Sequence, residues 1–446
     1  MNFRSVLSIA GSDSSSGAGI QADLKTFSSL GTYGCFAITA ITVQNTKNIF
    51  DVFPIPSEIV IKQINSILHD IKIDAIKIGM VYDGEIINKI FQVLKNINIP
   101  IIVDPVFTST SGTNLIKADA IKALTKKIIP IATIITPNIN EAKQLSGVEI
   151  KTKEDLVKAI NKIKKLGPKF VILKGGHLLS EHCIDTLIDD KLNIIEFSNS
   201  RLPIPENHGS GCNFSAALSA YISQGYEIPI ACKFANEFIN GILKNLLYLG
   251  KGYPVTDASI TTSSSAFKFH VLEELSRAIK ELESLSDIGK LIPETQSNFA
   301  YAIPNATSIK EVAGIKGRIV RIDQKVKASS CIEFGASQHI ASAIISYMAI
   351  NPLMRAGFNI KYDKKIIEVL QSFMKVSEYD RLLEPRKLKE KEGFTIQWGI
   401  KKAIKKDKSV RGIYHKGDIG KEPMIIMFGH KPAEIIQYLT KLIDNY

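Results

Sequence analysis

Residues 74–104 read DAIKIGMVYDGEIINKIFQVLKNINIPIIVD, and this stretch decides the fold class. The run DAIKIG at 74–79 and the run PIIVD at 100–104 are short and apolar, as buried strands are. The residues between them, 83–96, have the pattern of a helix. Two strands joined by a helix are expected to run parallel, because the helix carries the chain back across the sheet. The stretch therefore predicts one unit of a parallel α/β sheet.

The same rhythm continues on both sides of this stretch. Further apolar strands are expected at 3–10, near 35–43, at 133–136 and at 170–175, and helices at 19–30, 57–70, 152–166, 213–224 and 229–248. The runs CIDTLID and KLNIIEFS, on either side of Asp189 and Asp190, predict an antiparallel hairpin at the sheet edge. Continuous apolar runs that alternate with helices indicate a parallel sheet covered on both faces. We therefore expect a first α/β domain of about 260 residues.

A second domain is expected to follow a segment rich in Gly, Ser, Thr and Pro, KGYPVTDASITTSSS at 251–265. We divide the chain into a first domain at 1–255, a linker and connecting helix at 256–290, and a second domain at 291–446. The second domain is predicted to be a smaller, separate α/β domain with a mixed sheet. Its expected strands are GRIVRI, FTIQWG and PMIIMFG, and its expected helices lie at 336–349, 363–374 and 432–443.

The charge of the chain is uneven. The 446 residues carry a formal net charge of +12, of which +3 lies in residues 1–262 and +9 in residues 263–446. A basic region favours anionic partners, which include nucleic acid, a membrane surface or phosphorylated small molecules. The lysine-rich run KKAIKKDK at 401–408 is interpreted as a solvated helix face.

The sequence indicates a cytoplasmic protein rather than a secreted or membrane protein. The apolar stretch in MNFRSVLSIAGSD is too short for a secretory signal. No apolar run approaches the roughly 18 residues of a membrane span. The five cysteines are scattered without CxxC spacing, which argues against a disulfide framework or a zinc site.

Candidate site residues follow the predicted strands, where ligands bind in parallel α/β sheets. They lie in the loop after the first strand, after PIIVD, after TIIT and at the end of FVILKGG: Gly11, Gly17, Gly19, Asp104, Asn138, Glu141, Lys174, Gly175 and Gly176. Glycine is common in such loops for turn geometry alone, so the joint placement on one sheet edge carries the argument.

The segment NHGSGCNFSAALSAYI at 207–222 is the strongest candidate for an anion site. Two glycines precede an amphipathic helix, so the backbone N–H groups of Gly209, Ser210, Gly211 and Cys212 are expected at a helix N-terminus. Such a terminus binds anions, most often phosphate. The alternative is a glycine-bearing helix start that only packs.

The first domain resembles the hydroxymethylpyrimidine/phosphomethylpyrimidine kinases of the ribokinase superfamily. The matching segments are SIAGSDSSSGAGIQADLKTFSSLGTYG, AITVQNT, IKIGM, VDPV, TPNINEA, LKGGH and HGSGCNFSAAL, in the order expected for that family. The resemblance implies a ribokinase-like parallel-sheet sandwich and ATP-dependent phosphorylation of the pyrimidine alcohol and then of its monophosphate, both in one site.

The resemblance implies a pyrimidine site made of five residues. Gln44 would hold the aminopyrimidine edge, since an amide can donate and accept hydrogen bonds at once. Gly11 and Asp23 would lie near the same ring, and Met80 and Val106 would form its apolar walls.

It also implies a site for ATP and Mg²⁺. Lys174 would steady the charge on the transferring phosphate, and the amides of Gly209–Cys212 would form the anion hole. Asn138 and Glu141, with Asp104 nearby, would hold Mg²⁺, through water in the case of Asn138 and Glu141.

Cys212 stands where many sugar kinases of the superfamily have Asp. A thiol at a helix N-terminus has a lowered pKa, so Cys212 is either a base or only a contact beside the reacting oxygen. Pyridoxal kinases share this cysteine, which leaves a vitamin B6 kinase as an alternative. Ser14 and Ser16 replace the proline and glycine common in the first loop, and Ser16 would be strained if its position needs a positive φ. Ser210 replaces the more usual threonine.

In the second domain, basic residues lie near turns or strand ends, where several could converge on phosphates. They are Arg318, Arg321, Lys327, Arg355, Lys361, Lys416 and Lys421. His339, at a helix start, is by itself more often structural than catalytic.

Residues 295–446 resemble the thiamine-phosphate synthase domain that follows the pyrimidine kinase in archaea and some bacteria. GRIVR, FGASQHIA, NPLMRAGFNIKYD, IQWG and GDIGKEPMI carry the resemblance. It implies that hydroxymethylpyrimidine diphosphate joins hydroxyethylthiazole phosphate with release of pyrophosphate. Arg318 would neutralise the leaving diphosphate, and His339 would donate a hydrogen bond or a proton to it.

The synthase-like domain also occurs as a ligand-binding module in DNA-binding regulators, so a thiamine-phosphate sensor is the alternative from another class. We see no recognition-helix pattern around 263–290 and expect small-molecule substrates and ATP, without nucleic acid or membrane. A homodimer is expected, because kinases of this branch often dimerise.

Overall fold

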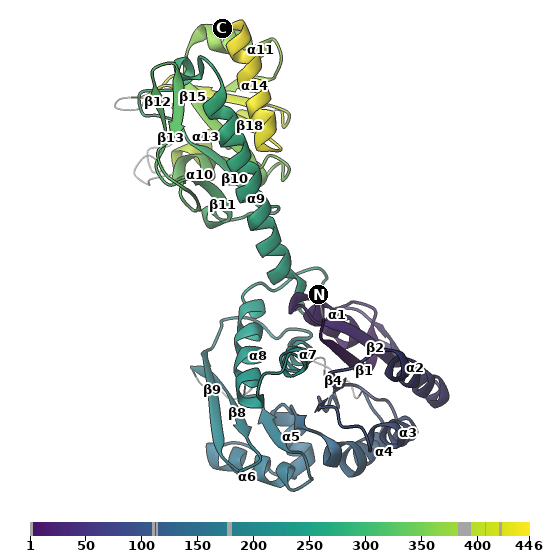
Figure 1. Cartoon of the computed structure of the whole chain (residues 1–446). Helices are drawn as coiled ribbons and strands as arrows, with labels where there is room; N and C mark the ends of the chain where they lie inside the picture. The colour runs from purple at the N-terminus through teal and green to yellow at the C-terminus, as the bar shows by residue number, and fades with distance from the viewer. Residues whose placement is uncertain are drawn as a thin grey trace. The chain divides into compact units, whose positions relative to one another are not determined.

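The computed structural model describes residues 3–108, 112, 115–175, 181–381, 394–405, 407–418 and 422–446, with the side chains of 394 and 395 excepted. The chain forms two compact units, Met1–Thr262 and Ser263–Tyr446 (Figure 1). Within the described residues, no helix is both long enough and apolar enough to cross a membrane.

The first unit is built on one sheet with the strand order β3-β2-β1-β4-β5-β6-β7-β8-β9. Its strands are β1 (Ser5–Asp13), β2 (Tyr33–Gln44), β3 (Ile49–Pro54), β4 (Ala75–Ile78), β5 (Ile101–Val103), β6 (Ile134–Ile135), β7 (Phe170–Leu173), β8 (His182–Ile188) and β9 (Ile194–Ser200). The pairs from β2 to β7 are parallel, whereas β3, β8 and β9 are added antiparallel. The predicted parallel sheet and the predicted edge hairpin are thus confirmed, and β3 is an edge strand that was not predicted.

Helices cover both faces of this sheet. They are α1 (Gly19–Ser29), α2 (Ser57–Asp70), α3 (Gly84–Leu94), α4 (Ala118–Ala123), α5 (Ile139–Ser146), α6 (Lys153–Lys164), α7 (Ser210–Ser223) and α8 (Ile228–Leu243). In β5, Ile101 and Val103 pack in the core with α2, α3 and α6, while Ile102 packs in the core with α1, α7 and α8. Because both faces are covered, the side chains of the central strands are buried on either side of the sheet, which explains their mainly apolar runs.

The strand ends bring the candidate residues to one edge. Asp104 directly follows β5, Thr136 follows β6 and Lys174 follows β7. β1 continues to Asp13, so Gly11 lies inside the strand, where the pairing with β2 shifts register, and not in the loop after it.

The second unit contains a mixed sheet with the order β14-β11-β10-β15-β18-β17-β16. Its strands are β10 (Phe299–Ala302), β11 (Val312–Ile315), β14 (Ile332–Phe334), β15 (Ala356–Lys361), β16 (Val376–Glu378), β17 (Gly412–His415) and β18 (Met424–Gly429), with a separate hairpin of β12 (Ile319–Ile322) and β13 (Lys325–Ala328). Only β16 and β17 pair in parallel, and the other pairs of the sheet are antiparallel. The helices α10 (Gln338–Met348), α11 (Lys364–Gln371), α13 (Phe394–Ile404) and α14 (Pro432–Asn445) contribute to one core.

Two expectations for this unit differ from the structure. The run FTIQWG was expected to be a strand, but it opens the helix α13. The helical pattern appears when the residues after this run are included. Ile396, Ile400 and Ile404 recur at a four-residue spacing, and Ile400 and Ile404 are buried. Lys401 and Lys402 are the exposed lysines of this helix, which ends at Ile404, so only the first half of KKAIKKDK is helical.

The segment expected to connect the domains is divided differently in the structure. The helix α9 (Ser259–Ser284) buries Val271, Leu275 and Leu282 in the core of the second unit. The boundary between the units falls between Thr262 and Ser263. Most of this helix therefore belongs to the second unit, because its apolar stripe is part of that core.

Candidate active site

The carboxylate of Asp104 is the centre of a hydrogen-bond cluster at the sheet edge. Lys174 Nζ lies 3.0 Å from Oδ1, Thr136 Oγ1 donates to the same oxygen at 3.0 Å, and Ser215 Oγ donates to Oδ2 at 3.0 Å. These groups come from the ends of three neighbouring strands and from α7, so the parallel topology gathers them. Asp104 is buried and accepts from all three side chains.

Lys174 lies beside the first turn of α7. Burial by itself would lower the pKa of Lys174, but the carboxylates of Asp104 and Glu141 hold it above its ordinary value. A Cβ on Gly211 would stand 3.3 Å from Lys174 Nζ, so the ammonium group lies close to the backbone of the GSGC turn. The structure thus brings an ammonium group and a helix N-terminus together, and both favour an anion.

Gly209 is required by the backbone at this point. It is the N-cap of α7 with a φ of 94°, and a Cβ there would stand 1.8 Å from the carbonyl oxygen of Gly17. No side chain caps this helix start. The first turn of α7, at Ser210, Gly211 and Cys212, therefore keeps its amides available for a ligand.

Cys212 does not have the lowered pKa that its place at a helix N-terminus predicts. Burial raises the pKa of the thiol to about 11, and the charges of Asp23 and Asp104 add to this, while Lys77 opposes it. The expected lowering is not seen, because burial disfavours the charged thiolate more than Lys77 favours it.

Asp23 is fully buried rather than open to a ligand. It accepts hydrogen bonds from Lys77 Nζ at 2.8 Å through each oxygen and from Ser8 Oγ at 2.6 Å. Lys77 was missed in the sequence, although a lysine inside the apolar strand DAIKIG is the signal that identifies it. The pair lies near Cys212, because the charge of Lys77 acts on the pKa of that thiol.

Three residues predicted for the pyrimidine site do meet. A Cβ on Gly11 would stand 3.0 Å from Met80 Sδ, and Met80 packs with Ala40 and the half-buried Val106 in one small apolar cluster. The strand β1 can approach Met80 this closely only because residue 11 has no side chain.

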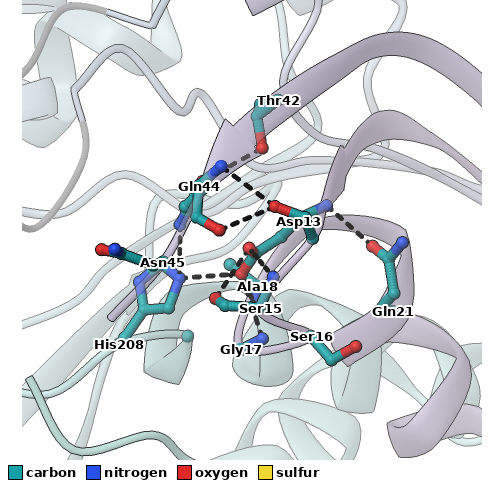
Figure 2. Close-up of polar contacts among 12 residues, drawn as sticks. Asp13, Ser15, Ser16, Gly17, Ala18, Gln21, Thr42, Gln44, Asn45 and His208 are labelled. Atoms are coloured by element: carbon teal, nitrogen blue, oxygen red, sulfur yellow. Dashed lines mark hydrogen bonds and ion pairs between the residues drawn. The ribbon is translucent and has the colours of Figure 1, made fainter. Parts of the chain in front are cut away.

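Gln44, the fourth of these residues, ends β2 and belongs to a polar network (Figure 2). Its amide lies 2.7 Å from His208 Nε2, and the same Nε2 lies 2.9 Å from Asp13 Oδ2. Asp13 and His208 were not singled out in the sequence. Their signal was their position, since each lies inside a segment that carries the resemblance, SIAGSD and HGSGC.

The two serine substitutions in the first loop have distinct effects. Ser16 has a φ of 60°, so its position does need a positive φ, and a non-glycine residue there costs on the order of 1 kcal/mol. The Ser14 hydroxyl donates to the carbonyl oxygen of Gln44 at 2.7 Å and accepts from its N–H at 3.0 Å. A proline at position 14 has no hydroxyl and makes neither bond.

Asn138 and Glu141 form a capping box at the start of α5. Asn138 Oδ1 accepts from the Glu141 N–H at 2.9 Å, and Glu141 Oε2 accepts from the Asn138 N–H at 2.8 Å. Burial raises the pKa of Glu141 to about 8, with Lys174 lowering it and Asp104 raising it. In the described part of the chain, no group of three or more His, Cys, Asp or Glu side chains could hold a metal ion.

In the second unit, Arg318 and His339 occupy exposed positions. The Arg318 guanidinium donates to the carbonyl oxygen of Thr295, and its backbone N–H donates to Ser329 Oγ at 2.9 Å. His339 lies in the first turn of α10.

Several other basic residues of this unit have local partners instead of a common focus. Lys327 pairs with Glu283 at 2.7 Å and Lys416 with Glu378 at 2.9 Å. Arg355 stacks 4.6 Å from the ring centre of Tyr301 and donates to the carbonyl oxygen of Ala302, and Lys361 stacks on Tyr446. Lys421, like Gly176, lies outside the described residues.

Comparison with known proteins finds two families along the chain. Residues 13–257 match the phosphomethylpyrimidine kinase family, and residues 274–441 match the thiamine-phosphate synthase ThiN family. A bifunctional thiamine biosynthesis protein of Methanocaldococcus jannaschii is 32% identical over 451 residues, which cover 99% of this chain and 99% of that protein.

A kinase relative and a solved structure match the first unit alone. A hydroxymethylpyrimidine/phosphomethylpyrimidine kinase of Aquifex aeolicus is 41% identical over 252 residues, which cover 56% of this chain and 98% of the relative. The structure of a pyridoxal kinase from Staphylococcus aureus, in complex with AMP-PCP and pyridoxal, superimposes with a TM-score of 0.53 and 35% identity. That superposition covers 58% of this chain and 94% of the kinase.

Proposed function

The chain belongs to the phosphomethylpyrimidine kinase family, and we propose which of its residues carry out two reactions of thiamine biosynthesis. The first unit is a kinase that uses ATP to convert hydroxymethylpyrimidine to its monophosphate and then to its diphosphate. The second unit is a thiamine-phosphate synthase, which joins this diphosphate to hydroxyethylthiazole phosphate and releases pyrophosphate. The reading as a pyridoxal-type kinase with a sensor domain is not favoured, because the match to the bifunctional protein extends over 99% of the chain.

Lys174 carries the proposal for the phosphate site. Its ammonium group is held 3.0 Å from Asp104 and lies at the first turn of α7, so one cation and the amides of Ser210–Cys212 face the same place. During transfer, the substrate oxygen attacks the γ-phosphorus and the bond to the bridging oxygen of ADP breaks. Lys174 and these amides stabilise the negative charge that spreads over the transferring group.

Cys212 takes the proton of the attacking hydroxyl in this proposal. It sits in the same first turn as the anion site, and its thiolate is a strong base because its pKa is raised to about 11. At neutral pH the thiol form prevails, so the rate would depend on a small thiolate fraction.

Mg²⁺, when bound, would supply positive charge that offsets the negative charge of the ATP phosphates. The oxygen donors near Lys174 suit this hard ion. A cation beside Glu141 would lower the raised pKa of this residue and so favour its carboxylate form. Because the capping box already occupies Asn138 Oδ1 and Glu141 Oε2, we propose that both residues hold the ion through water.

For the synthase, Arg318 would neutralise the leaving diphosphate and His339 would donate to it. Both are exposed and lie at element starts, where a polyanion can reach them. Departure of pyrophosphate leaves a carbocation-like pyrimidine. A positive side chain beside the leaving group's negative oxygens lowers the activation free energy of that step.

We also propose that the chain forms a homodimer through the outer strands β2 and β3. Ile41 and Phe53 pair across these strands and are 45% and 62% exposed, and Val43 is 54% exposed on the same face. Light scattering on the whole chain tests this, with Phe53→Asp expected to give a monomer. A monomeric unmodified chain would contradict the proposal.

One assay tests the pair of reactions. The purified chain receives hydroxymethylpyrimidine, ATP, Mg²⁺ and hydroxyethylthiazole phosphate, and thiamine phosphate is measured together with ADP. We expect two ADP for each thiamine phosphate. If the chain forms the diphosphate and binds thiamine phosphate but makes none, the second unit is a sensor and not a synthase.

A further inference from the structure

The amide of Gln44 is held at both ends by side chains of the first unit (Figure 2). His208 Nε2 lies 2.7 Å from one end of the amide, and Thr42 Oγ1 lies 3.3 Å from the other. An amide can exchange its oxygen and nitrogen by a half-turn, so these contacts decide which atom stands at which end.

Asp13 determines the hydrogen on His208. Its Oδ1 accepts from the N–H and the hydroxyl of Ser15 at 2.8 Å each, and its Oδ2 accepts from the N–H groups of Gly17 at 3.0 Å and Ala18 at 2.8 Å. Four such donors leave the carboxylate without a proton. Burial alone would raise the pKa of Asp13, but hydrogen bonds from His208 and Ser15 lower it to about 2. His208 Nε2, 2.9 Å from Oδ2, must therefore carry a hydrogen and donate it.

The hydrogen on Nε2 excludes one orientation of Gln44. With the amide nitrogen at the His208 end, two donors would face each other at 2.7 Å. The half-turn that places Oε1 there removes this clash, because the single Nε2–H of His208 is then shared between two acceptors, Asp13 Oδ2 and Gln44 Oε1.

Thr42 leads to the same orientation independently. Its hydroxyl hydrogen is used in a bond of 2.8 Å to the carbonyl oxygen of Ser12. Thr42 Oγ1 can then only accept from Gln44, so the atom at this end is the amide nitrogen. Both ends of the amide agree, with Oε1 toward His208 and Nε2 toward Thr42.

We propose that His208, held by Asp13, is a positioning residue that sets the orientation of the Gln44 amide and thereby selects the aminopyrimidine edge. The proposal rests on the kinase function given above. After anchoring, Oε1 keeps a lone pair and Nε2 keeps a hydrogen. An aminopyrimidine presents a donating amino group beside an accepting ring nitrogen, so it fits this amide in one sense only. The corresponding 4-oxo pyrimidine presents the opposite order and would need the amide reversed.

The backbone holds both partners in place before a substrate binds. The His208 ring packs against Gly17, where a Cβ would stand 2.4 Å from Cδ2, and the His208 N–H donates to the carbonyl oxygen of Pro254 at 2.8 Å. On the other side, the Ser14 hydroxyl bonds both backbone groups of Gln44. A recognition group held in this way loses little freedom on binding.

The test compares His208→Leu with His208→Gln in the full chain, because a glutamine N–H can replace the donor at Nε2. His208→Leu is expected to raise the KM for hydroxymethylpyrimidine about tenfold, as expected for one lost hydrogen bond to a polar group. The kcat and the KM for ATP should stay near their original values. The ratio of kcat/KM for hydroxymethylpyrimidine to that for its 4-oxo analogue should fall. His208→Gln should restore most of both properties.

A double-variant cycle separates this role from simple packing. If His208 acts through Gln44, then His208→Leu has no further effect on KM in a Gln44→Ala chain. Additive effects of the two changes would overturn the proposal, and so would a loss confined to kcat or an unchanged KM in His208→Leu.

Thr42→Val provides a second route should His208→Leu fail to fold, since it removes the acceptor at the other end of the amide. It is expected to raise the KM for hydroxymethylpyrimidine and to lower the preference for hydroxymethylpyrimidine over the 4-oxo analogue. An unchanged KM and preference in a folded Thr42→Val would overturn the proposal. Failure of the kinase function itself would look different, because the unmodified chain would then not phosphorylate hydroxymethylpyrimidine at all.

Discussion

The ammonium group of Lys77 lies 2.8 Å from each carboxylate oxygen of Asp23, and both side chains are fully buried. Burial by itself would lower the pKa of Lys77, but Asp23, with smaller contributions from Cys212 and Asp104, raises it above its ordinary value. The pair joins β4 to α1 beneath the active site, and each charge depends on the other for its compensation.

Removal of one member of this pair is expected to destabilise the first unit strongly. Lys77→Met leaves the buried Asp23 carboxylate uncompensated and should lower the free energy of unfolding by about 3–5 kcal/mol. The double variant Lys77→Met, Asp23→Asn should lose less free energy of unfolding than Lys77→Met alone, because no buried charge is left without a partner. Denaturant unfolding of the whole chain measures this, with the first unit identified by the transition that ATP shifts.

Lys89→Met is the matched control, because Lys89 pairs with Glu58 and Glu85 at the surface. It should leave the free energy of unfolding nearly unchanged. A Lys77→Met chain as stable as the Lys89→Met chain would show that the buried pair contributes no stability.

Cys212 should give the kinase a distinctive pH dependence. If its thiolate accepts the substrate proton, kcat should rise about tenfold per pH unit between about pH 7 and 9, because the reactive form becomes populated only toward the thiol pKa of about 11. Cys212→Ala should lower kcat by about 100-fold and remove this rise. Cys331→Ala, at an exposed cysteine of the second unit, serves as control. A flat profile, or full activity of Cys212→Ala, would make Cys212 only a contact.

Glu141 should make the first unit less stable as the pH rises. Its pKa of about 8 in the folded chain exceeds the ordinary value of 4.5, so between these values the unfolded chain binds fewer protons than the folded one. This contribution is fully present below pH 4.5 and is lost as the pH rises through about 8.

Glu141→Gln keeps an acceptor for the Asn138 N–H but cannot ionise. Its Tm relative to the original chain should increase from about pH 5 to pH 8 and level off above that. A Tm difference that stays constant over this range would contradict the raised pKa.

Arg318→Ala should affect one reaction only. Without its charge on the leaving diphosphate, thiamine phosphate formation from supplied hydroxymethylpyrimidine diphosphate should fall by about 100-fold. ADP formation from hydroxymethylpyrimidine and ATP should not change. Lys327→Ala is the control, because that lysine is already paired with Glu283 at 2.7 Å. Equal synthase activity in both variants would remove Arg318 from the site.

Local patterns in the sequence are informative where one element's own residues decide its structure. The continuous apolar run of β5 predicts a strand, because a strand covered on both faces buries successive side chains in the two layers of the core. FTIQWG shows the limit, since six residues with aromatic and β-branched members suit a strand, and the helical spacing emerges only when Ile400 and Ile404 are included.

The sequence by itself determined the parallel α/β architecture of the first unit, its edge hairpin and the segments that make the site, because periodicity, turn residues and the order of the elements along the chain are read from the sequence directly. Only the tertiary structure decided the contacts of Lys77, the network of Asp13, His208 and Gln44, and the raised pKa of Cys212. These properties depend on which distant side chains meet and on how much water they exclude. For Cys212 the cost of burying a charge exceeds the benefit of the nearby Lys77, and that balance exists only once the chain has folded.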